Sequence, residues 1–288
     1  MDKFLIVTAD DFGLHPAINA AVEAASAAGV LTAASLMVGA PEAADAVRRA
    51  RQLPGLRIGL HLVLADGRAV LPRRVIPGLV GEDGRFRNRM FVDAVRYVAR
   101  PTLRSQLEAE IRAQFEAFAR SGLALDHVNT HKHFHLHPTI LSLILRIGRE
   151  FGMHAVRVPH EPAWLAAHIG GWPAAGSSLL LAPWAQLMRA RLSANRITCN
   201  DRLFGIAASG ALDERTLLAI LARLPAGVSE IHMHPAAPCA GPITAAMTQY
   251  RHADELAALL SPRVRDAVGA SGARCGGYQD LIRMRLGP

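Results

Sequence analysis

Short runs of apolar and β-branched residues recur along the chain, separated by longer stretches in which apolar residues repeat at helical spacing. The run FLIVTA at 4–9 is apolar at almost every position, which is typical of a strand buried on both faces of a parallel sheet. Such runs predict strands at 4–9, 33–38, 57–64, 124–130, 154–159 and 228–234. The helical spacing predicts helices near 16–29, 41–53, 102–121, 138–151, 177–193, 213–223 and 244–260.

The alternation of predicted strands and helices continues along the chain without a break in composition. This pattern predicts one α/β domain over 1–288 with a parallel sheet. Together with the short run RITCN at 196–200, which lies between two predicted helices, about seven such strands favour a closed or nearly closed, TIM-like (β/α) barrel over an open doubly wound sheet. Segment 65–90 is rich in Gly, Pro and Arg, and predicts a long loop of the kind that often carries function. The nucleotide-binding motif GxGxxG is absent.

Hydrophobic residues make up 51% of the 288 positions and charged residues 19%, as expected for a folded protein with a sizeable core. The net charge of +8 would suit nucleic acid, an anionic membrane surface or an anionic substrate, but an Arg-rich surface alone also produces it. The basic residues are dispersed and are not interleaved with aromatic residues, so we expect no nucleic-acid partner. Three widely spaced cysteines without a CxxC pair argue against a disulfide framework or a cysteine-based zinc site.

The N-terminal sequence has an apolar run of five or six residues followed directly by carboxylates, which is unlike a signal peptide. No uncharged run approaches the roughly 20 residues that span a bilayer. We therefore expect a cytoplasmic protein.

Polar side chains that could carry chemistry fall where the predicted strands end. In parallel α/β folds the carboxyl ends of the strands meet at one edge, so side chains there can converge on one point. The candidates at these ends are Asp10, Asp11, His61, Arg157, His232 and His234. His61 taken alone is more typical of a hydrogen-bonded residue of the core, and only its convergence with other polar groups would give it a role.

The adjacent aspartates Asp10 and Asp11 favour a divalent metal site. Two neighbouring carboxylates are costly to bury in ionised form unless a cation compensates them. A metal ion would bind one carboxylate and leave the other free as a base, and adjacent residues at a strand end point in different directions. A turn or a helix N-cap is the alternative explanation of the sequence Asp-Asp-Phe-Gly.

The segment HVNTHKHFHLHP at 127–138 holds five of the chain's 13 histidines, all at odd positions. In an extended segment such positions face the same side. Five histidines cannot all be ligands, whereas two histidines and one carboxylate with open positions form a recognised catalytic metal arrangement. Such a set is compatible with Zn²⁺, and Mg²⁺, Mn²⁺ or Co²⁺ could also occupy it.

Four motifs together resemble the YdjC family of metal-dependent carbohydrate deacetylases. They are TADDFG near the N-terminus, GLHL further along, HVNTHKHFH in the middle of the chain and a late HP. Each motif is weak alone, but the four in this order over residues 8–235 are specific. The resemblance implies a distorted (β/α) barrel that hydrolyses N-acetyl groups on amino sugars.

The resemblance also implies roles for individual residues. Asp11, His61 and His131 would bind one divalent metal ion, Mg²⁺ or Zn²⁺. Asp10 would be the general base, and His234 the general acid.

Other residues of these motifs would support the substrate. His133 and His135 would face the substrate or orient groups that do, whereas His127 and His137 would cap the strand and the following helix. Arg157 would orient the sugar or a nearby phosphate, and a surface ion pair is the alternative for it. Asn129 stands where family members often have Asp, which removes a charge that could orient a histidine.

A longer form of the histidine motif, NTHKHFHLHP, and the stretch 182–212 resemble a narrower branch, the hopanoid-biosynthesis-associated YdjC-like proteins. That resemblance implies an N-acetylglucosaminyl hopanoid lipid as the substrate. Soluble chitooligosaccharides, or hydrolysis of another amide or of a phosphoester, are the alternatives. The run 177–192 mixes Leu, Trp and Met with Arg189 and Arg191, and predicts either a helix packed on the barrel or a peripheral membrane contact.

Overall fold

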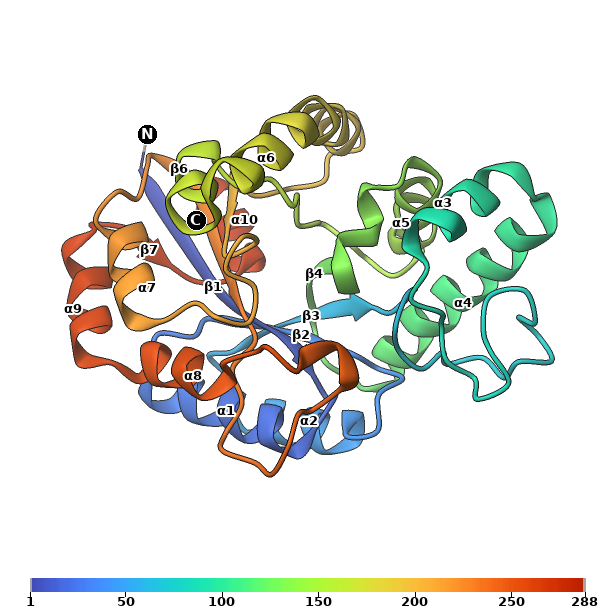
Figure 1. Ribbon diagram of the computed structural model, residues 1–288, viewed down its shortest axis with the longest axis horizontal. Coiled ribbons are helices and arrows are strands. Elements are labelled where there is room, and N and C mark those ends of the chain that lie inside the picture. Colours follow the sequence, from blue (N-terminus) through green and yellow to red (C-terminus); the bar gives the residue numbers. More distant parts are fainter. Residues whose placement is uncertain (1, 287–288) are drawn as a thin grey trace.

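A curved sheet of parallel strands forms the centre of the protein (Figure 1). The computed structural model describes residues 2–286, apart from the side chains of residues 91, 98, 166, 168–174 and 177. Six strands follow one another in the order β4-β3-β2-β1-β6-β5, and β7 pairs with β1. The strands are β1 (Lys3–Phe12), β2 (Ala33–Leu36), β3 (Arg57–Leu62), β4 (Leu125–Thr130), β5 (Arg202–Phe204), β6 (Gly227–Met233) and β7 (Arg274–Cys275).

The two ends of this sheet, β4 and β5, are joined by the irregular segment 154–160. Val156 bridges to Val128 of β4, and Leu203 of β5 donates its backbone N–H to the carbonyl of His160 at 2.9 Å. The sheet therefore curls into a distorted, TIM-like (β/α) barrel, as predicted from the sequence. The strand predicted at 154–159 is wrong as a regular element, because this segment forms only isolated bridges.

Helices wrap the outside of the sheet (Figure 1). They are α1 (Pro16–Ala28), α2 (Ala43–Ala50), α3 (Met90–Ala99), α4 (Pro101–Arg120), α5 (Pro138–Glu150), α6 (Ala163–Ala194), α7 (Glu214–Leu221), α8 (His252–Leu260), α9 (Pro262–Ala270) and α10 (Tyr278–Leu286), with 3₁₀ turns η1 (His131–Leu136) and η2 (Ala245–Met247). Each predicted helix has a counterpart in this set. The long loop predicted before residue 90 is confirmed, because no named helix or strand lies between Leu62 and Met90.

The helix predicted at 244–260 is wrong in its first half. Only the turn η2 forms there, and α8 begins at His252. The backbone N–H of Arg251 donates to the carbonyl of Gly210 in a neighbouring loop, so it is not available to continue a helix from η2.

The strands alternate between two environments, as period-2 geometry requires. On β1, Leu5 and Val7 pack into the main apolar core between sheet and helices. Phe4 and Ile6 belong instead to a smaller cluster with Tyr278 of α10, on the inner face of the barrel. The next inward positions along β1 are polar, so the apolar floor of the barrel gives way to polar layers toward the carboxyl ends of the strands. No helix among residues 2–286 is both long enough and apolar enough to cross a membrane.

Candidate active site

A pocket of about 210 Å³ opens at the carboxyl ends of the strands. Asp10 of β1, His61 of β3 and His232 of β6 contribute to its wall. The long loop after β3 and the loop before α8 cover its rim. Further lining residues include Asp66, Arg68, Arg85, His131, Lys132, His133, His234, Met247 and Tyr250.

Asp11, His61 and His131 form a compact cluster at one side of this pocket. The Asp11 carboxylate lies 3.3 Å from His61 Nε2 and 3.1 Å from His131 Nδ1. One ligand atom from each residue lies within 4.8 Å of the others. Asp11 is fully buried, and neither of its carboxylate oxygens has a hydrogen-bond donor among residues 2–286.

The chemistry of this donor set fits a divalent metal ion. Burial would raise the pKa of the Asp11 carboxyl, but the two imidazoles hold it below its usual range, so the residue is an anion. A buried anion and two imidazole nitrogens facing one point are the donors of a carboxylate–histidine metal site. The Asp11 oxygens without donors are explained if a cation satisfies them.

The local backbone is unusual where these ligands are presented. Asp11, Lys132 and His133 have φ values of 62°, 56° and 56°, in the left-handed region that non-glycine residues rarely adopt. The turn at Asp11 breaks the strict alternation of β1, so that Asp10 and Asp11 can both serve the same pocket. Gly13 follows with φ 96°, and a Cβ atom there would lie 3.2 Å from Ala43 Cα. Strain of this kind concentrates at functional sites.

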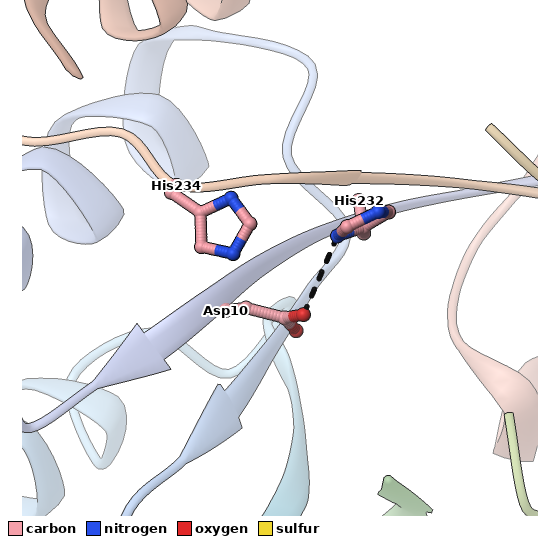
Figure 2. Close-up of side chains that lie close together, drawn as sticks. All are labelled: Asp10, His232 and His234. Atoms are coloured by element: carbon pink, nitrogen blue, oxygen red, sulfur yellow. Dashed lines mark ion pairs between the residues drawn. The ribbon is translucent and has the colours of Figure 1, made fainter. Parts of the chain in front are cut away.

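Asp10, His232 and His234 form a second cluster that also brings three possible ligand atoms within 4.8 Å of one another (Figure 2). His232 Nδ1 lies 3.5 Å from the Asp10 carboxylate. Arg157 already holds that carboxylate, with Nη1 at 2.6 Å from Oδ2 and Nη2 at 3.0 Å from Oδ1. A metal ion here would lie beside a guanidinium cation, so this cluster is better suited to moving protons than to binding metal.

Electrostatics give the members of the second cluster different charges. Burial opposes ionisation of Asp10, but Arg157 and His61 hold the pKa of its carboxyl well below its usual range. Burial lowers the pKa of His234 to about 4, so its imidazole is neutral at pH 7. Asp10 is therefore an anion and His234 is a neutral ring.

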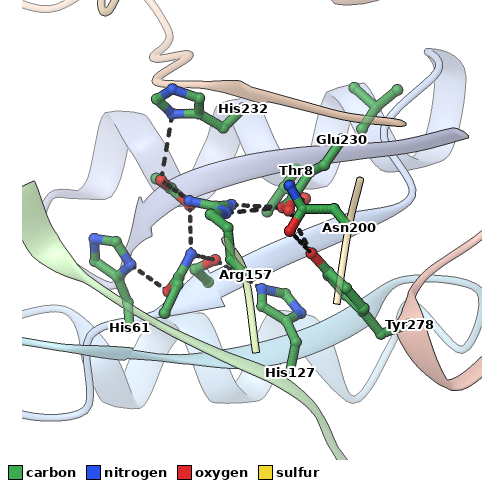
Figure 3. A network of polar contacts seen from close by, with 12 residues as sticks. Thr8, His61, His127, Arg157, Asn200, Glu230, His232 and Tyr278 are labelled. Carbon is green, nitrogen blue, oxygen red and sulfur yellow. Dashed lines mark hydrogen bonds and ion pairs between the residues drawn. The ribbon is translucent and has the colours of Figure 1, made fainter. Parts of the chain in front are cut away.

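Arg157 is fully buried and lies between the carboxylates of Asp10 and Glu230 (Figure 3). Its Nη2 lies 2.7 Å from Glu230 Oε1, which also accepts a hydrogen bond from Thr8. Arg157 does not contribute to the pocket wall. The surface ion pair considered for it is wrong because the pair is buried, and the role in orienting a sugar stays a prediction.

The remaining histidines of segment 127–138 separate into different environments. His133 lines the pocket, and its Nδ1 has no partner among residues 2–286. His135 is buried away from the pocket, with Nδ1 2.7 Å from Thr130 Oγ1 and Nε2 2.7 Å from the carbonyl of Arg157. His137 stands at the N-cap position of α5 without a side-chain cap hydrogen bond. His127 points into the barrel interior rather than capping its strand.

Sequence reasoning gave no role to His232, although it named it as a candidate, and it missed Glu230 and Tyr250. The period-2 alternation of β6 could have placed Glu230 and His232 on the inner face, because inward Val228 is followed two and four residues later by these two residues. Tyr250 lines the pocket, and its ring centroid lies 5.3 Å from that of His234. No local pattern signals it, since it follows an irregular loop.

Comparison with known proteins identifies the family. The family model described as YdjC-like protein matches residues 4–270. The chain belongs to the YdjC-like family. Among curated relatives of this YdjC-like protein, a carbohydrate deacetylase of Brevibacillus brevis is 37% identical over 56% of this chain and 60% of its own length. A carbohydrate deacetylase of Mus musculus is 29% identical over 98% of this chain and 96% of its own length.

The chain spans about 60% of the length of the first bacterial relatives it matches. A solved structure from Enterococcus faecalis V583, described as a cellobiose-phosphate cleavage protein, aligns with this YdjC-like protein at a TM-score of 0.77 and 25% identity. That alignment covers 98% of this chain and 99% of the other. An uncharacterized protein from Agrobacterium tumefaciens C58 aligns over 97% and 89% with a TM-score of 0.51 and 13% identity, and shares the fold alone.

Proposed function

We propose that this protein is a metal-dependent hydrolase that removes the acetyl group from an N-acetylglucosamine unit. The observation that carries the proposal is the Asp11–His61–His131 cluster beside the anionic Asp10 at a pocket, in a chain of the YdjC-like family. Relatives named carbohydrate deacetylase support the reaction type and an acetylated sugar as the substrate.

Asp11, His61 and His131 would hold the metal ion, which when bound supplies a Lewis acid for an amide carbonyl and for water. Asp10 accepts the proton that water loses as it attacks the amide carbon. Arg157 keeps Asp10 anionic and fixes its orientation through two contacts. The products are acetate and the free amine of the sugar.

In this proposal His234 protonates the leaving amine, but it begins the reaction neutral because burial lowers its pKa. It can therefore act as the acid only after it has taken up a proton. Asp10 is the nearby source, since the ligand atoms of Asp10, His232 and His234 lie within 4.8 Å of one another. In this proposal the proton taken from water passes from Asp10 to His234 and then to the amine.

Acetate release by purified, metal-loaded protein tests the proposed function. We expect chelator-sensitive release from either soluble diacetylchitobiose or an N-acetylglucosaminyl hopanoid in detergent. Release from neither, by protein whose metal content is confirmed by elemental analysis, would contradict N-deacetylation. Assays on other amides and on phosphoesters would then find the reaction.

We further propose that the acetylated sugar is carried on a lipid, as in the hopanoid-associated branch. Helix α6 supports this proposal with exposed apolar side chains and no acidic residue between Ala163 and Ala194. The exposed set comprises Trp164, Leu179, Leu180, Leu181, Trp184 and Leu187. Arg189 and Arg191 do not extend freely toward headgroups, because each donates to a backbone carbonyl of the protein. The contact with the bilayer would therefore rest on the apolar side chains.

Sedimentation with vesicles tests the contact of α6. We expect wild-type protein to co-sediment with phosphatidylglycerol-containing vesicles, and the variant carrying Leu179→Ser and Leu180→Ser to remain in the supernatant. Leu286→Ser is the matched control, because Leu286 of α10 is 81% exposed, as is Leu180. Equal sedimentation of the double variant and wild type, or no sedimentation of either, would remove α6 as a membrane contact.

A further inference from the structure

A chain of buried hydrogen bonds connects the active site to the interior of the barrel. Asp126 Oδ2 lies 2.9 Å from His127 Nδ1, and His127 Nε2 lies 3.1 Å from Ser35 Oγ. Ser35 Oγ in turn accepts from Asn129 Nδ2 at 2.9 Å. Asn129 touches both halves of the site, with Oδ1 2.7 Å from His61 Nδ1 and Nδ2 3.3 Å from Asp10 Oδ1. All these residues are at most 2% exposed.

The donors and acceptors along this chain can be arranged in one consistent direction. Asn129 must present its NH₂ group to Asp10, because the opposite orientation would bring its carbonyl oxygen against a carboxylate. Its NH₂ group therefore donates to Ser35, and the Ser35 hydroxyl hydrogen is left to donate to His127 Nε2. His127 then carries its proton on Nδ1 and donates it to Asp126.

The same arrangement of donors and acceptors determines which nitrogen of His61, at the other end of the chain of hydrogen bonds, carries the proton. Asn129 Oδ1 can only accept, so His61 carries its proton on Nδ1. In the neutral ring Nε2 then carries the lone pair, and that nitrogen is the one that lies 3.3 Å from Asp11. A metal-binding imidazole needs this tautomer, which a partner on its other nitrogen usually sets.

Two features of the fold are built around the ring of His127. Gly59 of β3 lacks a Cβ atom where one would lie 2.4 Å from His127 Cε1, so only glycine leaves room for the imidazole. At the other end, Asp126 accepts the backbone N–H groups of Tyr278 and Gln279 at 3.0 and 2.8 Å. These are the first amides of α10, which favour an anion at the helix N-terminus. Asp126 is thereby held as the final acceptor.

We propose that Asp126, His127 and Ser35 are positioning residues that orient Asn129, and through it His61 and Asp10. The arrangement has the order of an Asp-His-Ser triad, but Ser35 is fully buried and does not line the pocket. Its hydroxyl has no access to a substrate and serves as a hydrogen-bond link. The proposal rests on the metal site of the proposed function. It also explains how Asn129 can replace an acidic residue. Its carbonyl oxygen accepts a hydrogen bond from His61, and its NH₂ group stands beside Asp10 where an aspartate would place a second negative charge.

Ser35→Ala tests the proposal because it removes the hydroxyl that joins Asn129 to His127 and takes away only one oxygen atom. We expect metal affinity, measured by titration of metal-free protein, to fall by roughly 10–100-fold, the range typical of groups that orient metal ligands. In metal-saturated protein, kcat is expected to fall by a similar factor while KM changes little. Ser229→Ala is the matched control, because Ser229 is also a buried serine of this sheet and its hydroxyl has no partner among residues 2–286.

Metal affinity and kcat of Ser35→Ala equal to those of Ser229→Ala would overturn the proposal. Thermal unfolding of both variants shows whether Ser35→Ala keeps the fold. Nitrogen-15 NMR of wild-type His127 provides a test that depends on neither variant: we expect a neutral ring protonated on Nδ1 alone at pH 7. A ring protonated on Nε2 would reverse the chain and also overturn the proposal. Neither metal titration nor NMR requires turnover, so failure of the proposed deacetylation would be recognised separately.

Discussion

Replacing Asp10 by asparagine is expected to lower kcat by about 10²–10⁴-fold while the protein still binds its metal ion. An amide cannot accept the proton that water loses, whereas Asp11, His61 and His131 are left unchanged. Asparagine keeps an oxygen that can face Arg157, and Glu230 still pairs with the guanidinium. The loss of stability should therefore stay below the about 3–5 kcal/mol that follows removal of one partner of a buried ion pair.

The measurements are kcat, metal content by elemental analysis and the thermal unfolding midpoint. Asp93→Asn is the matched control, since Asp93 also pairs with an arginine, Arg96 at 2.7 Å, but lies outside the pocket. We expect it to leave kcat unchanged. Wild-type turnover by Asp10→Asn would show that another group accepts the proton, and the neutral imidazole of His234 would be the next candidate.

His131→Ala is expected to abolish turnover through a different route, by losing the metal ion. Removing one of the three groups that face the site should weaken metal binding by more than the roughly 10–100-fold seen for residues that only orient ligands. Metal that binds only the folded state stabilises it by about 2.7 kcal/mol at a hundredfold excess over Kd. Chelator should therefore lower the unfolding midpoint of the wild type and leave that of His131→Ala unchanged.

His137→Ala provides the comparison within the same histidine-rich segment. His137 precedes α5 and does not line the pocket, so its variant should keep the metal and the chelator-sensitive midpoint. A full metal complement in His131→Ala would remove His131 from the ligand set. His61→Ala, which we also expect to lose the metal, would then show whether the cluster binds metal at all.

Much of the barrel could be predicted because its strands are buried on both faces and read as continuous apolar runs. The segments 4–9, 33–38 and 57–64 coincide with β1, β2 and β3 to within a few residues. β5 and β7 have three and two residues, too few to show a period. Segment 154–159 has the composition of a strand, but its partners meet it at single residues, and this depends on the closure of the barrel rather than on local sequence.

The candidate site could be predicted as a set of residues but not as a geometry. The strand-end rule brought Asp10, Asp11 and His61 together, and the structure places all three at one end of the barrel. Their roles stay predictions until the variants are measured. Arg157 shows what the sequence could not supply. A polar residue at the end of a predicted strand is interpreted as facing substrate. Here Glu230, an inward residue of β6, holds the Arg157 guanidinium inside the barrel.

Helix α10 links the order of folding to the candidate site through two buried carboxylates. Its Tyr278 hydroxyl donates to Glu230 at 2.6 Å, and its first amides satisfy Asp126. Glu230 and Asp126 both lie in strands that precede α10 in the sequence. Glu230 contacts Arg157, which also contacts Asp10. Asp126 is connected to Asp10 by the chain of hydrogen bonds that ends at Asn129. Until residues 278–286 are in place, Glu230 and Asp126 lack these hydrogen bonds and have only the partners in the rest of the barrel, which are Arg157 and Thr8 for Glu230 and His127 for Asp126. The candidate site, though composed of residues that precede α10 in the sequence, therefore gains these hydrogen bonds only when α10 docks.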